Sequence, residues 1–177
     1  MNLFLFRLVT GIMSSSALRA DFFRRSLINM DLTKNFPRSP KQKMAGIVML
    51  PRTIDKARAF NAGTLGEYHY DCPLDKEVFT FLGVDQAAFA KKARELNDAQ
   101  LEDWVRTTFL TKKTPADINV FNEEFLADAP APNSESEERF LKTRNRLDPS
   151  RTDVVTWPGL LDLEEGRSPR PVGARNS

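Results

Sequence analysis

The stretch from Arg52 to Asp75 gathers the side chains of this chain that are best suited to chemistry. It holds the only cysteine, Cys72, the only histidine, His69, and both tyrosines. A thiolate is a nucleophile and an imidazole can act as a base. Cys72 and His69 are therefore the candidate catalytic residues, for a thiol-dependent enzyme or a redox sensor.

Local backbone structure decides whether these two residues can act together. Cys72 precedes Pro73, and a proline at the first helical position would make Cys72 the N-cap of a helix, where the dipole favours the thiolate. His69 lies three residues upstream, and in a strand this odd spacing would place the two side chains on opposite faces. A catalytic pair therefore requires a turn. The alternative is a small buried cysteine and a hydrogen-bonded structural histidine.

A group of charged residues lies just upstream of this pair. Asp55 is three residues from both Arg52 and Arg58, and Lys56 follows it. On one helix Asp55 would bridge the two arginines and orient them toward a carboxylate or phosphate. The alternative is an ordinary solvated ladder of salt bridges. The predicted binding surface, for a small anionic ligand or a protein partner, comprises Arg52, Asp55, Lys56, Arg58, Tyr68 and Tyr70.

Most elements around these residues are predicted to be helices. Ser39 places a capping hydroxyl before a proline, and apolar residues recur at helical spacing as far as Ala57. Within that run, Pro51 either kinks the helix or begins a second one. Residues 114–117 (TPAD) form the clearest helix start in the chain. Residues 67–72 show aromatic alternation, which predicts a short strand or an extended linker.

The fold predicted from this pattern is mainly α: a compact bundle of about six short helices, with at most one extended segment near residues 67–72. A single domain is expected over residues 30–166. The acidic pair Glu164-Glu165 is interpreted as part of a solvated helical face.

Charge is divided unevenly along the chain. The formal net charge is +2, yet residues 30–166 contain 19 basic and 23 acidic residues. An acidic body disfavours nucleic acid as a partner, because phosphates are bound by clustered Lys and Arg. No run of about 20 apolar residues predicts a membrane span. A single cysteine excludes an intramolecular disulfide and suits the cytoplasm.

No cofactor and no metal site is predicted. One cysteine and one histidine do not make a zinc site. The sequence also contains no Walker A motif, no Rossmann glycine pattern, no G-x-S-x-G and no H-E-x-x-H.

The two ends of the chain differ in composition from the body. Residues 1–29 are rich in arginine and serine and poor in acid, which fits a targeting segment, a structural arm or an extension upstream of a start at Met30. Residues 167–177 contain two prolines and one large apolar residue. They are predicted to be a disordered tail.

Two segments carry a resemblance to a known family. LPRTIDKARA (residues 50–59) and GEYHYDCPLD (residues 66–75) are similar to an uncharacterised bacterial family catalogued only as a domain of unknown function. The resemblance extends from residue 30 to about 165. It implies a start at Met30 and a bacterial cytosolic setting, but no activity.

Because catalytic signatures are absent, the sequence favours a ligand-binding or protein-interaction module. The alternatives are a thiol-dependent enzyme or redox sensor that uses Cys72, and a structural subunit of a larger assembly.

Overall fold

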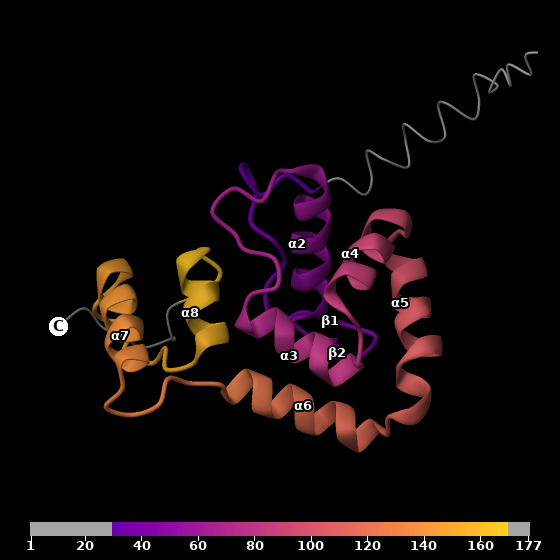
Figure 1. Ribbon diagram of the computed structural model, residues 1–177. Coiled ribbons are helices and arrows are strands. Elements are labelled where there is room, and N and C mark those ends of the chain that lie inside the picture. Colours follow the sequence, from indigo (N-terminus) through magenta and orange to yellow (C-terminus); the bar gives the residue numbers. More distant parts are fainter. Residues whose placement is uncertain (1–29, 170–177) are drawn as a thin grey trace, which may run out of the picture.

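The computed structural model describes residues 30–169, and their fold is mainly α-helical, as predicted (Figure 1). The expectations for residues 1–29 and 170–177 lie outside the described residues. In chain order the elements are β1 (Lys43–Met44), β2 (Ile47–Val48), α2 (Leu50–Ala62), α3 (Pro73–Leu82), α4 (Gln86–Glu95), α5 (Asp98–Thr108), the 3-10 helix η1 (Leu110–Lys112), α6 (Pro115–Ala127), α7 (Glu135–Leu147) and α8 (Trp157–Glu164).

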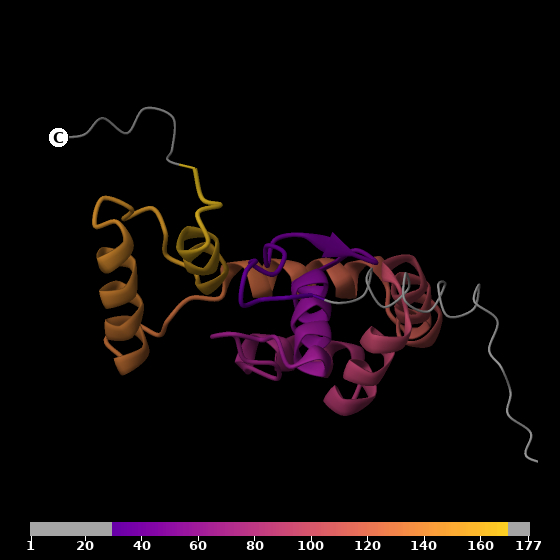
Figure 2. The ribbon, with the colours of Figure 1, turned by 90° about the horizontal axis from the view of Figure 1, so that it is seen from above.

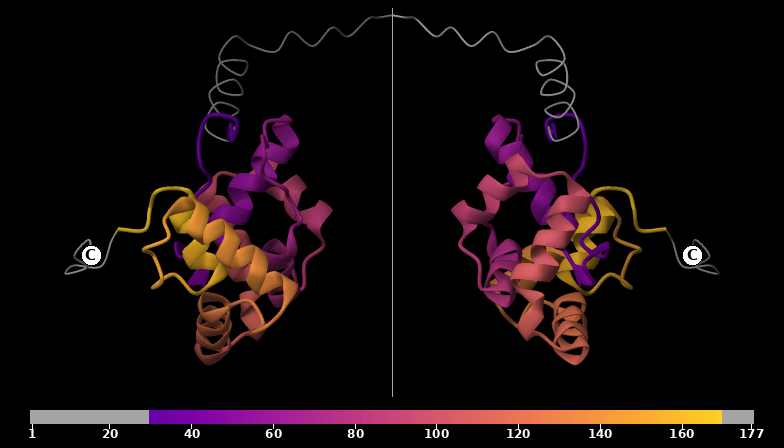
Figure 3. Two further views of the ribbon diagram at one scale, coloured as in Figure 1. Left: turned by 90° about the vertical axis from the view of Figure 1, so that its left-hand side faces the viewer. Right: turned by 90° about the vertical axis from the view of Figure 1, so that its right-hand side faces the viewer.

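The helices form a main body and a smaller unit at one end. In Figure 1, α2 stands upright over α3, with α4 and α5 to one side and α6 along the base. Seen from above, α8 lies between the main body and α7 (Figure 2). Figure 3 views the α7–α8 end and the α4–α5 end in turn. No helix in the described part of the chain has the length and apolar character needed to cross a bilayer.

Two apolar clusters correspond to these two parts. The larger is built from the hairpin and helices α2 to α6. The smaller joins Phe140 of α7 to Val154 and Leu160, with Trp157 packed against it. We call the second part, residues 135–164, the α7–α8 unit. Polar contacts join it to the main body: Ser39 donates to Asp162 at 2.7 Å, for example.

A β-hairpin replaces the helix that was predicted to begin at Ser39. β1 pairs antiparallel with β2, and the two residues between them, Ala45 (φ 54°) and Gly46 (φ 87°), both have left-handed backbone. This is the geometry of a type I′ turn, whose twist matches that of the paired strands. A further left-handed residue, Met49 (φ 65°), precedes α2. Pro51 therefore lies in the first turn of a helix and does not kink one.

Asn122 of α6 holds the hairpin against the helices. Its side-chain oxygen accepts from the backbone N–H of Val48 at 2.9 Å, and its amide nitrogen donates to the carbonyl of Gly46 at 2.8 Å. The Asn122 side chain is buried, and of its two partners Val48 is buried and Gly46 is exposed.

Asn122→Ala is expected to lower the free energy of unfolding by about 1–3 kcal/mol, because the N–H of the buried Val48 loses its acceptor, whereas the carbonyl of the exposed Gly46 can bond to water. Urea denaturation measures the difference. Asn145→Ala, at an exposed position of α7, serves as the control and is expected to change stability by less than about 0.5 kcal/mol. Equal losses in the two variants would contradict this role for Asn122.

Residues 67–72 form a linker of turns and irregular backbone, so of the two predicted alternatives the short strand is wrong. The strands of the described chain lie at residues 43–48 instead. Gly66 (φ 61°) lets the loop pass close to the N-terminal segment: a Cβ at this position would lie 3.0 Å from the carbonyl oxygen of Leu32. The 66–72 segment is thereby placed beside residues 32–36, and both segments line the cavity described next.

Candidate functional site

A cavity of about 870 Å³ lies between the main body and the α7–α8 unit. Its main-body wall comes from residues 32–36, from the first half of α2 and from the segment 66–74. The opposite wall is formed by Leu147 at the end of α7 and by residues 161–165 at the end of α8. Segments far apart in sequence therefore enclose one space.

Five of the eight predicted site residues line this cavity, namely Arg52, Lys56, Tyr68, His69 and Cys72. The other three, Asp55, Arg58 and Tyr70, contribute to other parts of the structure and are described below.

A buried ion pair between Arg52 and Glu165 forms one part of the wall. The guanidinium donates to both carboxylate oxygens, at 2.6 and 3.0 Å, and the side chains are only 2% and 3% exposed. Tyr68 donates its hydroxyl to the same carboxylate at 2.9 Å, and its ring lies beside the Arg52 guanidinium. Arg167 donates to Glu165 as well, and also to the carbonyl oxygen of Pro37.

This arrangement corrects the interpretation of Glu165 as a solvated residue. It is a buried acceptor shared by three donors. The environment also raises the pKa of Tyr68 to about 12, because burial disfavours the phenolate and because the hydroxyl donates to the Glu165 carboxylate. Tyr68 is therefore a neutral hydrogen-bond donor at physiological pH.

A second buried ion pair, between Lys56 and Asp75, lies behind Cys72. The ammonium is 2.6 Å from the carboxylate, and the side chains are 4% and 0% exposed. Asp75 also accepts from the hydroxyl of Thr53 at 2.9 Å and from the backbone N–H of Cys72 at 3.2 Å. This contact ties the N-terminus of α3 to α2.

The same ammonium reaches the thiol. Lys56 Nζ lies 3.1 Å from Cys72 Sγ, and Cys72 is the N-cap of α3, as predicted from Pro73. His69 is exposed at the cavity and makes no hydrogen bond within the described part of the chain. The basic group in contact with Cys72 is therefore Lys56 and not His69.

A family model described as a domain of unknown function (DUF5069) matches residues 34–167. The chain belongs to this family. The match confirms the resemblance seen in the sequence, and it covers both buried ion pairs of the cavity. No curated protein matches the chain.

In this DUF5069 domain, Asp55 does not bridge Arg52 and Arg58, so the predicted bridge is wrong. Asp55 instead accepts three hydrogen bonds from Arg38, through the backbone N–H, Nε and Nη2. Arg58 donates to Asp98 at 2.6 Å and to two backbone carbonyls. These residues are largely buried, so they do not form the solvated ladder that was the alternative.

Asp98 joins the two halves of this second charge cluster. It accepts from Arg38 at 2.7 Å and from Arg58. Burial works against ionisation of Asp98, but the two guanidinium groups outweigh it and hold the pKa of the carboxyl below its usual value. The cluster fixes the N-terminal segment and the start of α5 onto α2, which is a structural role.

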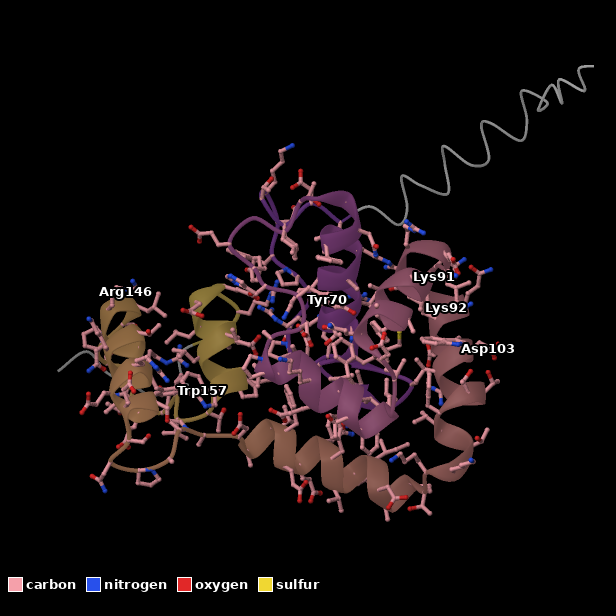
Figure 4. The ribbon with its side chains drawn as sticks, viewed as in Figure 1. Tyr70, Lys91, Lys92, Asp103, Arg146 and Trp157 are labelled. Carbon is pink, nitrogen blue, oxygen red and sulfur yellow. The ribbon has the colours of Figure 1, made fainter. Side chains whose placement is uncertain are left out.

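Tyr70 of the DUF5069 domain packs into the main body. Its ring stacks on Phe60 and meets the edge of Phe79, and its hydroxyl donates to the carbonyl of Gln86 at 2.8 Å. It lies near α2 and α4 (Figure 4). Burial raises the pKa of this tyrosine, with nearby carboxylates adding to the effect. Through these contacts Tyr70 fixes the 66–72 segment to the main body.

Sequence reasoning missed three residues of the cavity region: Asp75, Glu165 and Arg167. Asp75 carries a local signal, because an acidic residue at the third position of a helix is typical of a capping box. Glu165 and Arg167 contact one another, but they carry no signal for the cavity, since their other partners lie more than 90 residues away in the sequence. Within residues 30–169, no group of three or more His, Cys, Asp or Glu side chains could hold a metal ion.

Proposed function

We propose that this domain binds a small molecule in the cavity between the main body and the α7–α8 unit. The observation that carries the proposal is the convergence there of five residues selected on chemical grounds, from α2, from the 66–72 segment and from the N-cap of α3. A cavity of about 870 Å³ is within the size range of small-molecule sites.

The lining combines apolar surface with a few fixed polar groups. Leu74, Leu147 and Leu161 contribute apolar surface, while Arg52 and Tyr68 are held in place by Glu165. Such a mixture is typical of ligand pockets, where apolar walls supply affinity and a few oriented polar groups supply specificity. Polar groups that are already fixed lose little entropy on binding.

The local charge favours a ligand with an anionic group. Two guanidinium groups, Arg52 and Arg167, share the single carboxylate of Glu165. Among these three side chains one positive charge is therefore left over, on Arg52 in the wall or on Arg167 beside it. Glu164 and Glu67 also line the cavity, and partial burial raises the pKa of the Glu164 carboxyl. A carboxylate or phosphate would complement this excess.

A ligand screen tests the proposal directly. The full chain is heated with a panel of small carboxylates and phosphates and with neutral compounds of matched size. We expect some anionic compounds to raise the midpoint of unfolding, because a ligand that binds only the folded state stabilises it. If the neutral compounds act equally well, the anionic preference is wrong; if no compound acts, the binding function loses its support.

Two tryptophan variants on one helix place the binding site. Leu147 and Leu141 both belong to α7 and are exposed to a similar degree, 40% and 37%, but only Leu147 lines the cavity. Leu147→Trp is expected to crowd the cavity and weaken binding of the compound identified in the screen at least about tenfold, which corresponds to about 1.4 kcal/mol. Isothermal titration calorimetry measures the dissociation constant.

The control is Leu141→Trp, for which we expect unchanged affinity. Equal affinity in both variants would show that the compound binds outside this cavity. Variants of Arg52 are less suitable for this test, because the Arg52–Glu165 pair also stabilises the fold.

A further inference from the structure

We propose that Cys72 and Lys56 form a covalent sulfur–nitrogen bond when hydrogen peroxide oxidises the thiol, which makes this pair a reversible redox modification site. The proposal does not depend on ligand binding, because it needs only the two side chains and peroxide.

The geometry brings a nucleophilic nitrogen to the sulfur and holds it there. Lys56 Nζ lies 3.1 Å from Cys72 Sγ, closer than van der Waals contact for these atoms. Lys56 is buried, and Asp75 fixes its ammonium at 2.6 Å. The amine therefore cannot swing into solvent, as most lysine side chains do.

The thiol, in contrast, is accessible. Cys72 is half-buried and lines the cavity, so a molecule as small as hydrogen peroxide can reach its sulfur. The sulfur also lies at the N-terminus of α3 and within reach of the Lys56 nitrogen. Cys72 is also the only cysteine of the chain, so no second thiol competes for its oxidised form.

The first step oxidises the sulfur. The Cys72 thiolate attacks one oxygen of hydrogen peroxide, the O–O bond breaks, and a sulfenic acid and hydroxide are formed. The sulfur loses two electrons to the peroxide. The hydroxide takes a proton from the Lys56 ammonium and becomes water, which leaves a neutral amine beside the sulfenic acid.

The second step joins the two side chains. The Lys56 amine attacks the sulfur, the S–N bond forms and the S–O bond breaks. The departing hydroxyl and one amine proton leave as a second water. In sum, one thiolate, one ammonium and one hydrogen peroxide give one sulfenamide and two waters. An excess of an external thiol reverses the link by attacking the sulfur and releasing the amine.

The bond would alter the wall of the cavity. It converts the Lys56 ammonium into an uncharged nitrogen, which ends the ion pair with Asp75, and it ties α2 to the start of α3. Without an adjacent amine, a sulfenic acid in the presence of excess peroxide proceeds to the irreversible sulfinic acid. The Lys56 side chain therefore protects Cys72 from that outcome.

Peptide mass spectrometry tests the proposal on the full chain. The folded protein is treated with hydrogen peroxide, alkylated, unfolded and digested with trypsin. Modification of Lys56 blocks cleavage after it, so we expect residues 53–58 linked to residues 59–76, with a mass two hydrogens below that of the separate peptides. This linked species is expected to be the main product that contains Cys72, and to disappear after treatment with dithiothreitol.

Three variants control for the assignment. Cys72→Ser and Lys56→Arg are expected to give no linked peptide. Lys76→Arg replaces an exposed lysine of α3, keeps the tryptic site and is expected to give the same link as the wild type. If wild-type Cys72 is recovered mainly as sulfinic or sulfonic acid in an unlinked peptide, or linked to a lysine other than Lys56, the proposal is overturned. The wild-type result decides this even if Lys56→Arg folds poorly.

Discussion

Arg52→Met is expected to lower the free energy of unfolding by about 3 kcal/mol. The substitution leaves the Glu165 carboxylate in a site where its side chain is only 3% exposed, and breaking a buried ion pair from one side costs about 3–5 kcal/mol. We expect the lower end of this range, because Tyr68 and Arg167 still donate to Glu165. Urea denaturation at neutral pH measures the change.

Two controls separate this effect from the loss of any arginine. Arg139 pairs with Glu135 on the surface of α7, where the side chains are 67% and 83% exposed, so Arg139→Met is expected to change stability little. The double variant Arg52→Met with Glu165→Met removes both charges of the pair and is expected to recover part of the loss, since Tyr68 and Arg167 then lose their acceptor. If Arg52→Met is no more destabilising than Arg139→Met, the pair does not contribute as proposed.

The Arg52–Glu165 pair also connects the two parts of the structure. Arg52 lies in α2 of the main body and Glu165 at the end of α8, so their contact helps to hold the α7–α8 unit in place. Asp162 makes a similar connection through Ser39 and Lys41. These contacts are polar, whereas each part has its own apolar cluster. The width of the cavity therefore depends on charged groups that line or adjoin it.

Helix starts were predictable from sequence because capping is a local interaction. At α6, the Thr114 hydroxyl accepts from the Asp117 N–H at 3.2 Å, and the Asp117 carboxylate accepts from the Thr114 N–H at 2.6 Å. Both partners lie within four residues of one another, so their types and order predict the contact. The same reasoning placed Cys72 correctly at the N-cap of α3.

The hairpin was missed because its signals are not local in the same way. Ser39 precedes a proline, as many N-cap residues do. Its hydroxyl, however, donates to the carboxylate of Asp162, 123 residues away. The turn residues Ala45 and Gly46 lack the Asn-Gly or Asp-Gly pattern that predicts a type I′ turn. The strands are held by Asn122, which comes from a helix more than 70 residues downstream.

In the candidate site, too, residue types could be predicted from the sequence, whereas long-range partners could not. Its cysteine, histidine, tyrosines and cations could be selected by residue type, since few side chains can do this chemistry. The partners of Arg52 and Asp55 could not, because spacing along a helix predicts only neighbours on that helix. Burial directs each cation of α2 to a carboxylate of another segment, and only the tertiary fold determines which one.

Asp75→Asn is expected to lower the free energy of unfolding by about 3 kcal/mol, because it leaves the Lys56 ammonium buried without its carboxylate. Asparagine keeps the shape of the side chain, but its single oxygen can replace only one of the two carboxylate oxygens that accept from Thr53 and from Cys72. The loss therefore combines the removed charge with one of these hydrogen bonds. Chemical denaturation of both proteins in one buffer measures the difference.

Asp117→Asn is a matched control, because Asp117 holds the same position in α6 as Asp75 does in α3, the third residue of a helix that begins with proline. Asp117 is exposed and faces no buried cation, so its variant is expected to lose much less stability. Adding Lys56→Met to Asp75→Asn removes the unpaired charge and is expected to restore part of the loss. Equal losses for the two asparagine variants would assign Asp75 a capping role alone, and the buried pair with Lys56 would then contribute nothing to stability.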